Sequence, residues 1–201
     1  MVSGWGLVIG GSWCGEAVKV SAGLEVCDRS SEERVPIPHQ RIDELRSPPT
    51  LAPPVDTLHF AYGSNMDARQ MARRCPRSRT VGLAELPGWR FRINSQGWAT
   101  IIPDSTGSVF GRLWTLPPED EAVLDLYEDL PSGLYTKQRL LVTPHDGGQS
   151  QAMTYLAADS TPGIPVAIYF QPILAAAIEC GFPEAYLREL QQWAPARPSI
   201  L

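Results

Sequence analysis

The stretch that decides the fold is residues 79–116, which read RTVGLAELPGWRFRINSQGWATIIPDSTGSVFGRLWTL. Short runs rich in β-branched and aromatic residues are separated by glycine, proline, serine and aspartate, a pattern typical of strands joined by turns. It predicts four short strands, at Arg79–Leu86, Trp89–Asn94, Trp98–Pro103 and Ser108–Leu116. The centre of the chain is therefore expected to be a β-sheet with turns at 87–88, 95–97 and 104–107.

Further strands and helices flank this centre. Upstream, Leu58–Tyr62 reads as a strand running into a tight turn at Gly63, and Ala68–Arg74 reads as a helix capped from residues 65–67. Downstream, a short helix follows Pro117 and Pro118 and stops near Glu128. The remaining predicted elements are the strands Leu134–Thr143 and Gln151–Ala157 and the helices Ile173–Cys180 and Glu184–Trp193.

The order of these elements predicts an α+β domain. Many successive strands, with helices inserted at two places, favour a mixed sheet or a small β-barrel with helices on its outside. There is no internal repeat and no regular alternation of strand and helix, which argues against a doubly wound fold. In the helix after Pro118, we expect Val123, Leu124 and Tyr127 to face the core.

The first 56 residues differ from the rest. Residues 28–46 are polar, and six prolines follow between residues 36 and 54. Such a segment has too little apolar surface to offset the entropy of ordering it, and it reads as a linker with polyproline character. We therefore expect an N-terminal extension at 1–56 that is disordered or a linker, a folded domain at 57–195 and a tail at 196–201.

Composition excludes several functional classes. The chain has 201 residues, 43% of them hydrophobic, and a net charge of −5. A packed core is therefore possible, but there is no basic footprint for nucleic acid or an anionic membrane. No run of about 18 apolar residues occurs, so a membrane-spanning helix is not expected. The N-terminus lacks the basic region of a signal peptide, and a cytoplasmic location is expected by default.

The cysteines and histidines indicate no metal site. Four cysteines are widely spaced without a CxxC pair, and the three histidines are scattered. We expect free thiols in a reducing compartment, with two disulfides in an exported protein as the alternative. The cysteines are Cys14, Cys27, Cys75 and Cys180.

Two stretches carry candidate chemistry. In Tyr62-Gly63-Ser64-Asn65-Met66 a strand, a glycine turn and a helix start follow one another, and successive backbone N–H groups there can point at one anion or developing oxyanion. A turn with a purely structural role is the alternative. In LDLYEDLPSGLY at 124–135, Glu128 lies where a helix gives way to a turn among apolar side chains. Partial desolvation there would raise its pKa toward that of a general base; a solvated helix-end charge is the alternative.

Charged neighbours of these stretches have open roles. Asp125 and Asp129 either pair with Glu128 or remain solvated at the helix end. The three arginines of helix 68–74 form a small basic face, which is either plain surface or a docking site for an acidic substrate tail.

Taken together and in this order, the two stretches resemble the γ-glutamylcyclotransferase family, including its γ-glutamylamine cyclotransferase-like and plant-type branches. The resemblance covers about residues 58–193 and implies a small β-barrel with flanking helices and a pocket at one end. Asn65 argues against the glutathione-specific branch, which carries a different loop. The matching segments are FAYGSNM at 60–66, GWATIIP at 97–103, VFGRLWTL at 109–116, LDLYEDLPSGLY at 124–135 and AIECGFPEAYLREL at 177–190.

The resemblance also implies roles for single residues. It makes Glu128 the catalytic acid/base, because Glu128 falls on the family's glutamate. Tyr135 would shape the pocket, and Tyr169 matches a family tyrosine more loosely. The residues that would surround the amino acid end of a γ-glutamyl group are Tyr62, Gly63, Ser64 and Asn65.

The function implied is a γ-glutamyl cyclotransferase that releases 5-oxoproline from a γ-glutamyl amine or amino acid. The substrate's own α-amino group is the nucleophile, so no cofactor and no metal is expected, and the partner is a small molecule. The chain itself is expected to be a monomer or a homodimer. The alternative is a non-catalytic γ-glutamyl-binding or regulatory module of the same fold.

Overall fold

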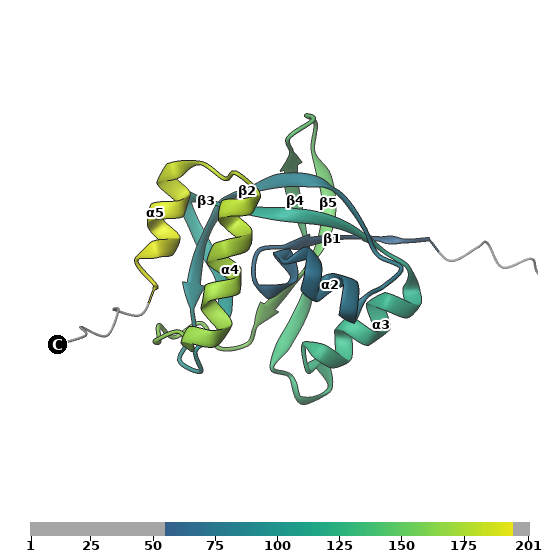
Figure 1. Ribbon diagram of the computed structural model, residues 1–201, viewed down its shortest axis with the longest axis horizontal. Coiled ribbons are helices and arrows are strands. Elements are labelled where there is room, and N and C mark those ends of the chain that lie inside the picture. Colours follow the sequence, from purple (N-terminus) through teal and green to yellow (C-terminus); the bar gives the residue numbers. More distant parts are fainter. Residues whose placement is uncertain (1–54, 195–201) are drawn as a thin grey trace, which may run out of the picture. The chain divides into compact units, whose positions relative to one another are not determined.

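The computed structural model describes residues 55–194, and in this part of the chain five strands close into a barrel (Figure 1). Their order around the barrel is β1-β3-β2-β4-β5. Neighbouring strands pair antiparallel except β1 and β5, which pair in parallel through His59 and Met153. The predicted small mixed barrel is confirmed. The strands are β1 (Thr57–Ala61), β2 (Arg79–Ile93), β3 (Ala99–Leu116), β4 (Tyr135–Pro144) and β5 (Ser150–Ala157).

The two terminal segments predicted from the sequence lie almost entirely outside the described residues. The extension predicted at 1–56 lies outside them except for its last two residues, and the tail predicted at 196–201 lies wholly outside them. Cys75 and Cys180 are free thiols, whereas Cys14 and Cys27 also lie outside the described part. Of the helices in residues 55–194, none has the length and apolar character needed to cross a membrane.

Two long strands stand where four short ones were predicted. Each of β2 and β3 is continuous, so the predicted breaks at 87–88 and 104–107 are wrong, although residues 104–107 of β3 have no partner in the β2 register. At the first of these, Gly88 adopts a φ of +80° and the register shifts between Pro87 and Trp89, which makes a bulge instead of a turn. At the second, a Cβ on Gly107 would lie 2.6 Å from the Trp89 carbonyl oxygen, so glycine permits a close approach of two paired strands. Only the predicted turn at 95–97 connects the two strands.

The core joins the barrel to the helices. Apolar side chains from β1, β2 and β3 and from α4 and α5 are fully buried, and each contributes about 1.5–3 kcal/mol through burial. Gly111 in β3 allows β1 to come close, because a Cβ there would lie 2.5 Å from the Ala61 carbonyl oxygen. Representative core residues are Phe60, Phe91, Leu113, Phe170 and Leu190.

The helices lie outside the barrel, with α4 and α5 on one side and α2 and α3 toward the other (Figure 1). Asp67 caps α2 by accepting a hydrogen bond from the backbone N–H of Arg69 at 2.8 Å. In α3 only Leu124 of the three residues predicted to face inward is buried; Val123 and Tyr127 are each 50% exposed. The helices and short 3₁₀ turns are η1 (Ser64–Met66), α2 (Ala68–Arg74), α3 (Pro118–Tyr127), η2 (Leu130–Ser132), α4 (Ala167–Glu179) and α5 (Glu184–Gln191).

α4 begins six residues before the predicted start at Ile173, and Pro172 lies inside it. The carbonyl that the missing Pro172 N–H leaves free is that of Ile168, a residue that is 85% exposed. Water can satisfy that carbonyl, so this proline does not end the helix. The structure thus brings α4, and Tyr169 on it, over the turn that follows β1, with which α4 makes its main contact.

Candidate active site

The turn after β1 presents unpaired backbone donors. Gly63 follows the end of β1 by two residues, and η1 is closed by a bond from the Met66 N–H to the Gly63 carbonyl at 3.0 Å. The Trp114 indole N–H donates to the Asn65 carbonyl at 3.0 Å and holds the turn against β3. Among the hydrogen bonds of residues 55–194, none uses the backbone N–H of Gly63, Ser64 or Asn65 as a donor. These N–H groups are therefore available to an anionic oxygen.

Glu128 lies at the C-terminal end of α3, opposite this turn. The following residue, Asp129, has a left-handed φ of 52°, which turns the chain sharply after the helix. The Asn65 side-chain amide donates to the Glu128 carboxylate at 2.7 Å. The residue as a whole is half-buried, but protein surrounds its carboxylate, and this desolvation raises the pKa of Glu128 to about 6 against the opposing effects of Asn65 and Arg74.

Arg74 orients Asn65. Its Nη1 donates to the Asn65 side-chain oxygen at 2.5 Å and to the Ser64 hydroxyl at 3.1 Å. With its oxygen engaged in this way, the Asn65 amide must present its NH₂ group to Glu128. The guanidinium also lies over the Tyr127 ring, 3.8 Å from its centroid. Arg74 thus belongs to the site, although its sequence context grouped it with two exposed arginines on the helix.

Two buried tyrosines, Tyr62 and Tyr135, and the partly buried Tyr169 form the wall of the pocket. The Tyr62 hydroxyl donates to the Tyr155 carbonyl at 2.6 Å, and the Tyr135 hydroxyl donates to the Ala99 carbonyl at 2.8 Å. The Tyr169 hydroxyl accepts from the Ala99 N–H at 3.3 Å. Burial raises the pKa of all three phenols above the ordinary value, so they are uncharged at neutral pH.

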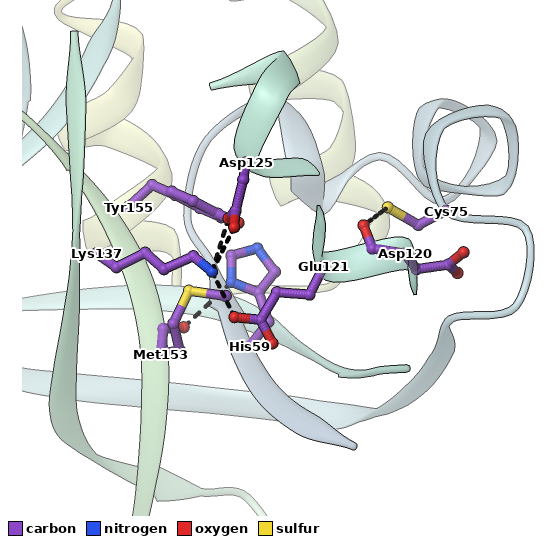
Figure 2. Close-up of polar contacts among 8 residues, drawn as sticks. All are labelled: His59, Cys75, Asp120, Glu121, Asp125, Lys137, Met153 and Tyr155. Atoms are coloured by element: carbon purple, nitrogen blue, oxygen red, sulfur yellow. Dashed lines mark hydrogen bonds and ion pairs between the residues drawn. The ribbon is translucent and has the colours of Figure 1, made fainter. Parts of the chain in front are cut away.

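A charged cluster lies between α3 and β4, beside the barrel (Figure 2). Lys137 pairs with Asp125 at 2.7 Å and with Glu121, and the Tyr155 hydroxyl donates to Asp125 at 2.7 Å. Asp125 therefore pairs with Lys137 and Tyr155, and the predicted option of a pair with Glu128 is wrong. His59 packs edge-on against Tyr155 with the ring centroids 5.4 Å apart. Burial lowers the pKa of His59 to about 4, so its ring is neutral.

The structure brings all seven residues implicated by the sequence to one pocket, which has a cavity volume of about 30 Å³. Sequence reasoning missed Arg74 as a site residue and missed His59 and Tyr155, which also line the pocket. Their sequence positions carry no signal for this role, because they lie on α2, β1 and β5, which meet at the site only in the folded chain. The seven are Tyr62, Gly63, Ser64, Asn65, Glu128, Tyr135 and Tyr169.

Comparison with known proteins shows which families the chain is similar to. Residues 108–190, which include Glu128, match the AIG2-like family. The γ-glutamylcyclotransferases of mouse and human are each 28% identical to the chain over 148 residues, covering 69% of this chain and 79% of theirs. A solved structure of a γ-glutamyl cyclotransferase matches with a TM-score of 0.65 and 26% identity, covering 72% of this chain and 91% of that one.

Proposed function

We propose that the chain, which is similar to γ-glutamylcyclotransferases in sequence and fold, releases 5-oxoproline from a γ-glutamyl amine or amino acid. In this reaction the substrate's α-amino nitrogen attacks its own γ-carbonyl carbon, a five-membered lactam forms, and the bond to the attached amine breaks. The nucleophile belongs to the substrate, so the protein has to hold the chain curled and move protons. Intramolecular alignment of this kind is worth about 7–11 kcal/mol at its upper range.

The observation that carries the proposal is the hydrogen bond between Asn65 and Glu128, inside a pocket that also holds the unpaired N–H groups of Gly63 and Ser64. This contact supports the proposal, because it joins a candidate base to a candidate anion site. A γ-glutamyl group has both features that these require, an ammonium group that must lose a proton and anionic oxygens that must be held.

Glu128 has the pKa that this role needs. With a pKa of about 6, its carboxylate is about nine-tenths ionised at pH 7, whereas a free α-amino group with a pKa of about 8 is mostly protonated. Glu128 takes the proton from the nitrogen as the nitrogen attacks, and then returns it to the departing amine. General acid/base assistance of this kind contributes about 10²–10⁴-fold to the rate.

The N–H groups of Gly63, Ser64 and Asn65 bind an anionic oxygen of the substrate, either its carboxylate or the tetrahedral oxyanion. Tyr62, Tyr135 and Tyr169 give the pocket neutral walls that exclude water from the ring closure. Arg74 is a positioning residue, because it acts on the reaction through the amide of Asn65.

The test is release of 5-oxoproline from a panel of γ-glutamyl amines and γ-glutamyl amino acids. Glu128→Gln should lower kcat by at least about 10²-fold, since the amide cannot accept the proton. Asp129→Asn is the matched control, because it removes an exposed carboxylate from the neighbouring residue and asparagine tolerates its left-handed conformation. Unchanged turnover in Glu128→Gln would overturn the role of Glu128, and tight binding without any product would favour the non-catalytic module.

A further inference from the structure

A second hollow adjoins the active-site pocket, and Glu128 is among the residues that line both. It has a volume of about 180 Å³. Since Glu128 lines both spaces, a group bound in the hollow lies next to the carboxylate that returns a proton to the departing amine. The hollow adds three residues of its own, Trp98, Tyr127 and Leu134, and the residues that it shares with the pocket are Ser64, Glu128, Tyr135 and Tyr169.

The walls of the hollow are apolar and lack a positive charge. Its own residues are two aromatic rings and one branched aliphatic side chain, and among the described residues that line it Glu128 is the one charged group. Arg74 does not line it, and both of its terminal nitrogens already donate to protein acceptors. A carboxylate bound in this hollow would therefore face Glu128, and the neighbouring cation, Arg74, lies behind Ser64 and Tyr127 with its donors already engaged.

The walls are also held in place. Trp98 packs edge-on against Tyr169 with the ring centroids 4.8 Å apart, and Tyr127 is backed by the Arg74 guanidinium. A preformed apolar hollow takes a flat apolar group without reorganising. A cavity of about 150 Å³ is known to hold a benzene ring, so 180 Å³ has room for a phenyl ring and its linker.

We propose that this hollow binds the leaving group, and that the preferred substrates are γ-glutamyl amides of aromatic or bulky apolar amines that carry no carboxylate. The inference rests on the proposed function and narrows the leaving group from amines and amino acids to apolar amines without a carboxylate. The α-ammonium nitrogen gains the bond to the γ-carbon and gives up two of its three protons, while the amine nitrogen loses its bond to that carbon. One of these protons passes through Glu128 to the leaving nitrogen as its bond breaks, and the second ends on the released amine, which leaves as an ammonium ion.

The test compares substrates that differ in one group. γ-Glutamylphenethylamide and γ-glutamylphenylalanine differ only in a carboxylate, and γ-glutamylethylamide lacks the ring. We expect kcat/KM for the phenethylamide to exceed that for each of the other two by at least about 10-fold, a typical effect of apolar contacts or an unpaired buried charge. Equal values for the phenethylamide and phenylalanine substrates, or for the phenethylamide and ethylamide, would overturn the proposal.

A substitution in the wall of the hollow tests whether the leaving group binds there. Leu134→Arg supplies the missing cation and should shrink the preference for phenethylamide over phenylalanine by at least about 10-fold, whereas Leu134→Met keeps an apolar wall and the preference. An unchanged preference in folded Leu134→Arg, checked by circular dichroism, would place the leaving group elsewhere.

Binding separates this inference from the proposed function. Calorimetry with Glu128→Gln measures the affinity for the same three compounds without turnover. If no compound is converted by the native protein but the phenethylamide binds at least about 10-fold more tightly, the hollow stands and the enzyme activity fails. If the affinities are equal, the inference fails whatever the turnover.

Discussion

Glu128→Gln should make the protein more stable at neutral pH while it removes activity. Burial raises the pKa of Glu128 to about 6 in the folded chain, against an ordinary value of 4.5. The folded state therefore holds the proton over a pH range in which the unfolded state releases it, and the free energy of unfolding of the native protein falls as pH rises from about 4.5 to 6.

The size of this effect follows from the shift. A difference of 6 − 4.5 = 1.5 units, at 1.36 kcal/mol per unit, is about 2 kcal/mol. Glutamine is uncharged and still accepts the hydrogen bond from the Asn65 amide. We therefore expect Glu128→Gln to have a free energy of unfolding about 2 kcal/mol higher than the native protein at pH 8, and about the same at pH 4.

Urea unfolding at pH 4, 6 and 8 measures this difference, with Asp129→Asn as the control for removing an exposed carboxylate. The control should change stability little at any of these pH values. If Glu128→Gln is no more stable than the native protein at pH 8, the carboxylate is well solvated, and the argument that burial tunes it as a base is refuted.

Three further predictions follow from the contacts of the site and barrel. Asn65→Ala removes a charge-assisted hydrogen bond worth about 1.5–3 kcal/mol, so the pKa of Glu128 should rise by about 1–2 units. A pH titration of the ¹³C chemical shift of the Glu128 carboxyl carbon measures that pKa, and an unchanged pKa in the variant would contradict the prediction. Gly111→Ala should destabilise the protein by about 1–3 kcal/mol in urea unfolding because its Cβ would meet the Ala61 carbonyl, whereas Gly82→Ala, with nothing within 4 Å, should not. Lys137→Met should destabilise the protein at pH 7, because Lys137 holds the pKa of the partly buried Glu121 below its ordinary value. The loss in free energy of unfolding should shrink as pH falls toward 4. If urea unfolding shows the same loss at every pH, the ion pair is not its cause.

The sequence predicted correctly those helices and strands whose ends are set by neighbouring residues, such as a capping side chain or a glycine turn. The helix at Ala68–Arg74 is found at those residues because Asp67 caps it, and the strand before Gly63 ends within one residue of its predicted end. The prediction failed at Gly88 and Gly107, where glycine serves a bulge and a close strand approach instead of a turn. Whether a glycine breaks a strand depends on the partner strand, which a single sequence does not display.

The site likewise has residues that a local sequence pattern predicts and residues that only the folded chain reveals. The turn at Tyr62–Asn65 and the helix end at Glu128 each have a local pattern, and the structure brings them within hydrogen-bonding distance. Arg74 has no such pattern, since it differs from the exposed Arg73 only in the direction that α2 gives it. Its importance arises from Ser64, Asn65 and Tyr127, which meet only in the folded chain.

The parallel pairing of β1 with β5 closes the barrel, and it determines when the pocket can form during synthesis. His59 and Met153, which meet at this seam, are separated by 94 residues, and closing a loop of that length costs about 4 kcal/mol of chain entropy. Asn65 and Glu128 lie within the loop that this closure encloses. A nascent chain that has not yet released β5 from the ribosome has no closed barrel, so the pocket is assembled late and all at once. Folding dominated by such distant pairings is slow compared with that of helical domains of similar size.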